Sequence, residues 1–228
     1  YVKTGKLPSN IELPTVLETT YEYFGNDLMI TMSNNTNMPV GYDINGHVRW
    51  YLNKELSWGP DQLENGNFIF GNRDLVDPYY NAEILEIDYL GKVYGRYNLP
   101  NGYHHDVTEL QNGNLIVATN EFKGTVEDII IEIDRVTGET VKTIDMDDYL
   151  NVLDGTSEMW SLIDWFHLNS LYYDKFTNSL LISGKNQDIV LSINYATLEL
   201  NWIIGDPLNW DEKLTSKYFF TPIGEDFE

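Results

Sequence analysis

The chain of 228 residues carries 14 Lys and Arg against 36 Asp and Glu, a formal charge of −22, and 42% of its residues are hydrophobic. This apolar content predicts one sizeable globular domain or two small ones and disfavours a disordered chain or a coiled coil. The negative charge repels phosphate backbones and anionic membranes, so no nucleic-acid partner is expected, and the absence of cysteine excludes disulfides and thiolate chemistry.

A recurring sequence pattern begins after residue 40. Residues 11–40, before it, are interpreted as the outer strands of a further repeat unit. Each copy is a β-rich run, an Asp or Asn, a turn and a second β-rich run. The markers Asp43, Asp88, Asp134 and Asn194 are spaced by 45, 46 and 60 residues, in VGYDINGHVRW, ILEIDYLGKVYG, IIEIDRVTGETVK and VLSINYATLELNW. A period in the forties is typical of repeat architectures.

A second recurring element lies between these hairpins, as DQLENGNFIFGN (61–72), TELQNGNLIVATN (108–120) and YYDKFTNSLLISGKN (172–186). Each is interpreted as strand, tight turn, strand, with Asn65-Gly66 and Asn112-Gly113 as two-residue turns that need positive φ. Every unit therefore offers about four short strands. Four-stranded units repeated at this period are typical of β-propeller blades.

The predicted fold is all-β, a β-propeller of four-stranded antiparallel blades with about four to five blades covered here. We expect a single, incomplete propeller domain over residues 1–228, with approximate blade units 40–85, 86–131, 132–191 and a partial 192–228. One short helical insertion is predicted near 146–166, over one end of the propeller. There an apolar stripe has helical spacing and consists of Leu150, Leu153, Met159, Leu162 and Ile163.

Three of the four histidines occupy related places, His104 and His105 in NGYHHDVTEL and His167 in DWFHLNSLYY. Counting back six residues from Leu110 and from Tyr173 matches His104 with His167 and Asp106 with Asn169. If the strand that holds each is innermost in its blade, both rings point toward the central channel. The alternative is that each imidazole is capped by a neighbouring carboxylate and has no further role.

Two cations follow apolar runs at corresponding places, Arg73 after FIFG and Lys185 after LLISG. With two imidazoles nearby they predict an anion site, and the alternative is two surface charges that balance an acidic protein. His47 is expected to be a solvated turn residue. Asp145, Asp147 and Asp148 lack the remaining ligands of a calcium loop and are interpreted as an acidic turn. No nucleotide, zinc-protease or hydrolase motif is present.

At these residues the sequence resembles the bacterial aryl sulfotransferases, also called arylsulfate sulfotransferases. The likeness is carried by GYHHDVTELQNGNLIVAT (102–119), by YDINGHVRWY (42–51) and by the long stretch from Asp164 to Pro207. The resemblance implies a six-bladed propeller that transfers a sulfuryl group from a phenolic sulfate ester to a phenolic acceptor, independently of the nucleotide donor PAPS. It further implies a ping-pong cycle through a sulfohistidine, with no cofactor and no metal.

Carried over residue by residue, the resemblance makes His104 or His105 a sulfate-binding or acid–base group and His167 another catalytic histidine. Lys185 stands where the family has arginine, and lysine lacks the planar fork that can grip two oxygens. Together with Lys185, the residues predicted to bind substrate are Arg73, Asn169 and Asp106. The family's nucleophilic histidine lies in a Gln-His motif after the GDP segment, which the sequence does not contain, so we expect a fragment of a longer enzyme.

The rival hypothesis is a non-catalytic propeller that keeps the family scaffold and binds a ligand or protein partner. The missing nucleophile and Lys185 favour this rival, whereas the matched histidines favour the enzyme. No apolar run approaches the roughly 20 residues of a membrane-spanning helix, so no membrane insertion is expected. The resemblance places the protein outside the cytoplasm, secreted, at the cell surface or in the periplasm, with its signal or anchor upstream, and leaves a homo-oligomer open.

Overall fold

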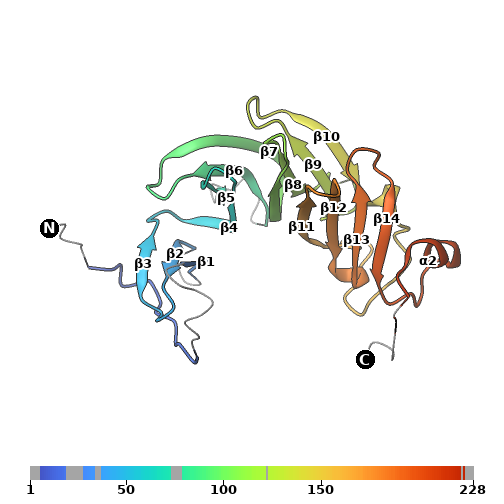
Figure 1. Ribbon diagram of the computed structural model, residues 1–228, viewed down its shortest axis with the longest axis horizontal. Helices are drawn as coiled ribbons and strands as arrows, with labels where there is room; N and C mark the ends of the chain where they lie inside the picture. Colours follow the sequence, from blue (N-terminus) through green and yellow to red (C-terminus); the bar gives the residue numbers. More distant parts are fainter. Residues whose placement is uncertain are drawn as a thin grey trace. The chain divides into compact units, whose positions relative to one another are not determined.

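The computed structural model describes residues 6–18, 28–33, 37–72, 79–121, 123–221 and 223. Figure 1 shows antiparallel strands that follow one another along the chain with little helix. The strands are β1 (Met29–Met32), β2 (Pro39–Tyr42), β3 (Val48–Tyr51), β4 (Leu56–Gln62), β5 (Phe68–Asn72), β6 (Asn81–Ile87), β7 (Val93–Glu109), β8 (Leu115–Thr119), β9 (Ile129–Ile133), β10 (Thr140–Asp145), β11 (Leu168–Asp174), β12 (Ser179–Gly184), β13 (Ile189–Asn194) and β14 (Leu200–Gly205). The helical segments are the 3₁₀ turns η1 (Met146–Asp148) and η2 (Lys185–Gln187) and the helix α2 (Glu212–Tyr218).

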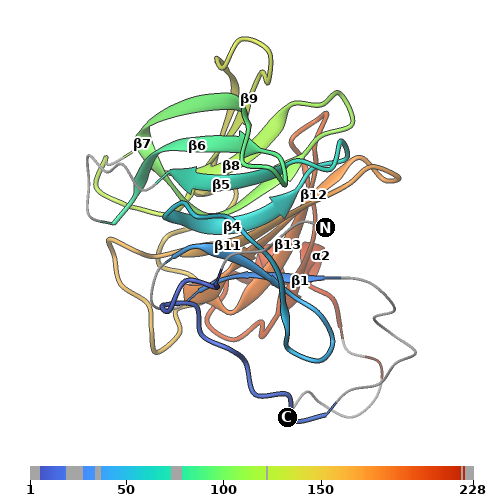
Figure 2. The ribbon, with the colours of Figure 1, turned by 90° about the vertical axis from the view of Figure 1, so that its left-hand side faces the viewer.

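The chain forms two compact units, residues 1–97 and residues 98–228, and the boundary falls within β7. In the first unit β1, β2 and β3 pair antiparallel, and so do β4, β5 and β6, which lie side by side in Figure 2. The core of the β4–β6 group is buried and apolar, and consists of Leu56, Phe68, Phe70, Leu85 and Ile87.

In the second unit the later part of β7 pairs with β8, which continues antiparallel through β9 to β10. The strands β11, β12, β13 and β14 form a separate four-stranded antiparallel sheet in chain order. These sheets match the predicted pattern of short antiparallel strands. The expected division between blade units at 191/192 falls inside β13, so the four-stranded sheet itself runs over residues 168–205.

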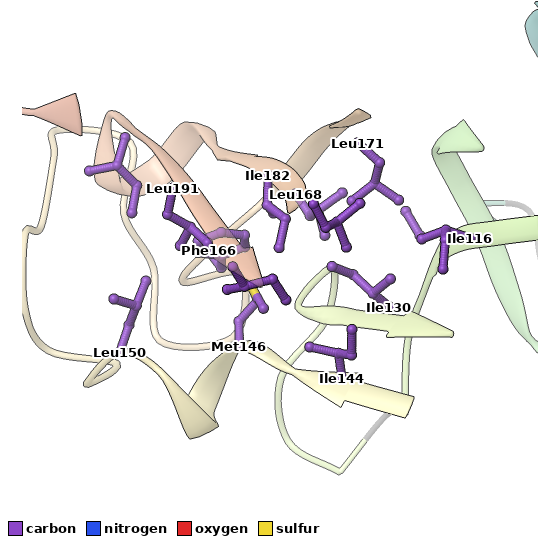
Figure 3. Close-up of a cluster of buried hydrophobic side chains, with 14 of the residues drawn as sticks. Ile116, Ile130, Ile144, Met146, Leu150, Phe166, Leu168, Leu171, Ile182 and Leu191 are labelled. Carbon is purple, nitrogen blue, oxygen red and sulfur yellow. The ribbon is translucent and has the colours of Figure 1, made fainter. Parts of the chain in front are cut away.

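Apolar side chains from both of these sheets meet in one core (Figure 3). Ile116, Ile130 and Ile144 come from neighbouring strands β8, β9 and β10, and they are joined by Leu168, Leu171, Ile182 and Leu191 of β11 to β13. Each of these side chains is at most 4% exposed. Burying one such side chain contributes about 1.5–3 kcal/mol. This core fixes the backbone that carries the histidines.

The four marker residues of the repeat cap hairpin turns. In each turn the side-chain Oδ1 accepts hydrogen bonds from two backbone N–H groups downstream, at distances of 2.8–3.0 Å. Asp and Asn favour such turns because a short side chain can satisfy backbone donors that the strands leave unpaired. The repeat in the sequence is therefore a repeat of turn chemistry, at Asp43, Asp88, Asp134 and Asn194.

The Asn-Gly turns differ in detail from the prediction. Gly66 and Gly113 have φ of +85° and +86°, whereas the asparagines before them do not have positive φ. In each loop the glycine N–H donates to the carbonyl three residues earlier, and the asparagine Oδ1 accepts from the backbone N–H two residues later. The loops are thus one residue longer than two-residue turns, with glycine in the left-handed position.

The predicted helical insertion at 146–166 is wrong apart from the 3₁₀ turn Met146–Asp148. Polar side chains accept hydrogen bonds from backbone N–H groups that would otherwise bond within a helix. The side chain of Asn151 accepts from the N–H of Leu153, and the side chain of Ser157 accepts from the N–H of Met159. Most of the supposed stripe faces outward, with Leu153, Met159, Leu162 and Ile163 60–66% exposed, while Leu150 is buried. Local side-chain hydrogen bonds therefore outweigh the apolar spacing.

A helix that the sequence did not suggest lies near the end of the described residues. In α2 the side chain of Asp211 accepts from the N–H groups of Lys213 and Leu214, which satisfies two donors of the first turn. Among the described residues, no helix has both the length and the apolar character needed to cross a membrane.

Candidate functional site

Two imidazoles from different parts of the second unit lie side by side. The ring centroids of His105, in β7, and His167, directly before β11, are 5.3 Å apart, and those of His104 and His105 are 5.4 Å apart. The structure thus brings together all three histidines that the sequence singled out. They converge from positions about 60 residues apart in the chain.

His105, rather than His104, is the residue whose ring lies beside that of His167. His105 and His167 share a left-handed backbone, with φ of 56° and 53°. The count from Leu110 and Tyr173 assumed regular strands, but the register shifts between Tyr103 and Val107 and again between Leu168 and Ser170. The strands are therefore irregular where the histidines lie, so a count along regular strands does not give the positions of the rings.

His104 is fully buried, and its ring makes a structural contact. The Nε2 atom lies 3.1 Å from the backbone oxygen of Thr119. Because a carbonyl can only accept, Nε2 is the donor and carries the proton. Burial lowers the pKa of His104 to about 4, despite the opposing effect of Glu127. The imidazole is therefore neutral near neutral pH.

A carboxylate that the sequence analysis missed lies between the other two imidazoles. Glu127 precedes β9, its Oε2 is 3.0 Å from Nδ1 of His167 and 3.5 Å from Nε2 of His105, and its side chain is 12% exposed. Burial raises the pKa of Glu127, but the His105 hydrogen bond and the nearby imidazoles outweigh it and leave the pKa below the ordinary value. Nothing in the sequence marks this residue among 36 acidic ones.

A second carboxylate, Asp164, contacts the same nitrogen. Its Oδ2 lies 2.7 Å from Nδ1 of His167, and its backbone oxygen accepts a hydrogen bond of 2.5 Å from the side chain of Asn186. A proton on Nδ1 can be donated to these carboxylates, which leaves the lone pair of the ring on Nε2. The spacing Asp-x-x-His is visible in DWFH and could have indicated this pair.

Three of the nine non-glycine residues with positive φ in the described part of the chain meet in this cluster. His105, Glu127 and His167 have φ of 56°, 57° and 53°, in the left-handed region that disfavours any residue with a Cβ. Each such residue costs about 1–3 kcal/mol, and residues of this kind cluster at active sites and ligand clamps. The fold retains this strain at the three side chains that converge, which marks the cluster as a functional-site candidate.

The other predicted residues are placed differently. Asp106 Oδ2 accepts from Ser170 Oγ at 3.0 Å and from the backbone N–H of Leu171 at 2.6 Å, so this carboxylate joins β7 to β11. Asn169 lies at the irregularity in the pairing of β11 with β12. Arg73 lies outside the described residues.

Lys185 is tied to His167 through the backbone. Its N–H donates to the carbonyl oxygen of His167 at 3.1 Å, and its side chain is exposed. Its ammonium group forms no ion pair with any carboxylate in the part of the chain that the structure describes. The backbone of Lys185 is thus held beside His167, and its side chain extends into solvent.

Likeness to solved structures defines the class of protein. The chain matches the WD40 β-propeller domain of Doa1 with a TM-score of 0.50 at 14% identity, over 82% of this chain and 53% of that one. It matches virginiamycin B lyase from Staphylococcus aureus with a TM-score of 0.51 at 12% identity, over 81% and 54% of the two chains. Together with the antiparallel sheets, these matches identify a β-propeller fold.

Residues 14–228 match the arylsulfotransferase (ASST) family, and the chain belongs to it, which confirms the resemblance seen in the sequence. Among curated proteins it is similar to the arylsulfate sulfotransferases AssT of Escherichia coli O6:H1 (strain CFT073) and of Lelliottia amnigena. Each is 22% identical to this chain, and the match covers 77% of this chain and 38% of the relative. The chain thus spans less than half the length of these relatives.

Proposed function

We propose that this chain supplies binding and proton-transfer groups for the transfer of a sulfuryl group from a phenolic sulfate ester to a phenol. The observation that carries the proposal is the side-by-side placement of His105 and His167 in a member of the arylsulfotransferase family. The backbone of Lys185 is bonded to His167, and we assign the exposed ammonium group of Lys185 to the sulfate of the donor. The arrangement meets the two needs of the reaction, which are charge stabilisation on sulfate oxygens and a proton for the leaving phenolate.

In the proposed cycle a histidine nitrogen attacks sulfur, the bond between sulfur and the aryl oxygen breaks, and the aryl oxygen takes a proton. The acceptor phenol then attacks the sulfohistidine and gives up its own proton, which restores the starting state. His167 suits the proton-transfer role because Glu127 and Asp164 both contact its Nδ1, so Nε2 is the atom that exchanges the proton.

The second candidate is a non-catalytic propeller that binds an anionic or aromatic ligand. Its support is that His104 is buried in a structural contact and that a lysine replaces the family arginine. In that case the cluster would bind a phenolic sulfate without breaking its bond to sulfur.

The test is phenol-dependent release of nitrophenolate from 4-nitrophenyl sulfate by the native protein. Replacing His167 with Ala is expected to reduce the rate by about a hundredfold or more, the range for loss of a positioned acid or base. The exposed His47→Ala variant is the control and should keep the full rate. An unchanged rate in His167→Ala would remove His167 from the site. Binding of the ester without turnover would support the second candidate, and release that needs no phenol would indicate a hydrolytic sulfatase.

A further inference from the structure

Three atoms that can bind a metal converge beside β11. One carboxylate oxygen of Glu127, one of Asp164 and one ring nitrogen of His167 all lie within 4.8 Å of one another. Nδ1 of His167 is 3.0 Å from Oε2 of Glu127 and 2.7 Å from Oδ2 of Asp164. We propose that Glu127, Asp164 and His167 bind one divalent transition-metal ion, with zinc as the expected occupant.

The spacing of these atoms is close to that of a coordination shell. Bonds of about 2.0–2.2 Å to nitrogen and oxygen place neighbouring ligand atoms about 3.3–3.5 Å apart in a tetrahedral zinc site and about 2.9–3.1 Å apart in an octahedral one. Separations of 2.7 and 3.0 Å around Nδ1 need only small rotations of the two carboxylates to admit the ion. His105 Nε2, 3.5 Å from the Glu127 oxygen, is the next nitrogen in reach.

A divalent metal ion balances the negative charge of this cluster better than a single proton does. The single proton that Nδ1 can hold faces two carboxylate oxygens, in a chain with a formal charge of −22. A divalent ion cancels both carboxylate charges. It takes the place of the Nδ1 proton, which passes to the solvent when the metal binds, and Nε2 then carries the N–H of the ring.

The ligand set selects among metals. Magnesium and calcium prefer shells made of oxygen, whereas imidazole nitrogen favours zinc and neighbouring transition metals. The chain has no cysteine, so a site of nitrogen and oxygen ligands is the type that it can offer. Two carboxylates and one imidazole also leave positions open for water or for an oxygen of an anionic ligand.

The three ligands are held in place by their neighbours. The backbone N–H of Glu127 donates to Asn120 Oδ1 at 2.6 Å, and the backbone oxygen of Asp164 accepts from Asn186. The backbone oxygen of His167 accepts from the N–H of Lys185. Such support orients ligands before a metal arrives. Metal binding stands apart from the proposed sulfuryl transfer, and only its consequence for an anionic substrate rests on that proposal.

The test is calorimetric titration of the metal-stripped full chain with zinc, in a buffer with excess magnesium to occupy acidic surface sites. We expect saturable binding of one zinc ion. His167→Ala and Asp164→Asn should each lower the affinity for zinc by at least about tenfold. A loss of that size is already seen when a residue that only hydrogen-bonds to a metal ligand is replaced. Glu158→Gln removes an exposed negative charge from the same unit and should leave the affinity unchanged.

Imidazole nitrogen NMR of the unsubstituted protein is a second test, and it does not depend on a variant folding correctly. With four histidines the spectrum is simple, and zinc should move the proton of His167 from Nδ1 to Nε2 while leaving His47 unaffected. Absence of saturable zinc binding, or zinc binding that leaves the His167 ring unchanged, would overturn the proposal. A titration with zinc requires no sulfate ester, so loss of transfer activity and loss of the metal site remain distinguishable.

Discussion

Nδ1 of His167 lies 2.7 Å from Oδ2 of Asp164, three residues earlier in the chain. The contact fixes which ring nitrogen faces the carboxylates and which one is left for chemistry. Asp164 is itself anchored, because Asn186 donates to its backbone oxygen. The pair thus has the arrangement that orients imidazoles in many acid–base sites, in which a carboxylate holds one nitrogen and the other reacts.

Asp164→Asn should therefore reduce turnover of an aryl sulfate by about a hundredfold, within the range for general acid–base catalysis. The amide keeps the shape of the side chain, but its NH₂ group can turn toward Nδ1 and favour the other tautomer. Steady-state rates with 4-nitrophenyl sulfate and phenol measure the effect, with Glu158→Gln as a matched loss of one charge. A rate in Asp164→Asn within twofold of the unsubstituted protein would show that the contact does not matter for turnover.

The repeat could be predicted from the sequence because it depends on local chemistry. Asp43 and its counterparts cap turns through hydrogen bonds to N–H groups two to four residues away, so each copy carries its own signal. The alternating apolar runs predict strands for the same reason. The helix expected at 146–166 failed where serine and asparagine side chains intercept the backbone, which apolar spacing alone does not show.

The site could be predicted only in part, because it depends on distant segments and on left-handed residues. The histidines were visible in the sequence, yet the irregular pairing near His105 means that a count along regular strands does not show which ring lies beside His167. Glu127 lies 40 residues before His167 and meets it through the packing of the second unit, which no local pattern encodes. The backbone N–H of Lys185 is bonded to the His167 carbonyl, whereas the anion-binding role of the Lys185 ammonium group stays a prediction.

The stability of the second unit should depend on pH through His104. Its pKa is about 4 in the folded protein against an ordinary value of 6.5, so the unfolded chain binds the proton first as the pH falls. The stabilisation is complete above pH 6.5 and is lost progressively toward pH 4. By pH 5 the free energy of unfolding has fallen by about 2 kcal/mol, because a pKa that differs between the folded and unfolded states makes stability depend on pH.

Urea denaturation at pH 7 and at pH 5 measures this loss. In His104→Gln the amide can still donate to the Thr119 carbonyl but does not titrate. The drop in the free energy of unfolding between pH 7 and pH 5 should therefore be about 2 kcal/mol smaller in this variant than in the unsubstituted protein. The exposed His47→Gln serves as the control and should behave like the unsubstituted protein. An equal pH dependence in His104→Gln would assign the effect to other groups.

The Asp106 carboxylate should matter for stability more than for substrate affinity. It accepts hydrogen bonds from Ser170 and from the backbone of Leu171, and it thereby joins β7 to β11. Asp106→Ala leaves the Leu171 N–H without this acceptor and should lower the free energy of unfolding by about 2–3 kcal/mol. Denaturation gives the stability, and the KM of the folded fraction should stay within about twofold. A large rise in KM at unchanged stability would instead place Asp106 at the substrate.

Glycine at position 127 should reverse the usual order of glycine and alanine. Glu127→Ala and Glu127→Gly both remove the carboxylate, but only alanine keeps a Cβ in the left-handed backbone, at a cost of about 1–2 kcal/mol. Glycine loses about 0.5–1 kcal/mol through the greater freedom of its unfolded chain, so the glycine variant should be as stable as the alanine variant or more stable.

The matched comparison is Glu139, an exposed acidic residue in the same unit without positive φ, where the alanine variant should be the more stable of the two. Urea denaturation of the four variants measures both differences. If alanine is the more stable residue at both positions, the left-handed strain at Glu127 is absent in solution. If the order reverses only at Glu127, the strain is real, and the fold holds this carboxylate against His167 at the expense of stability.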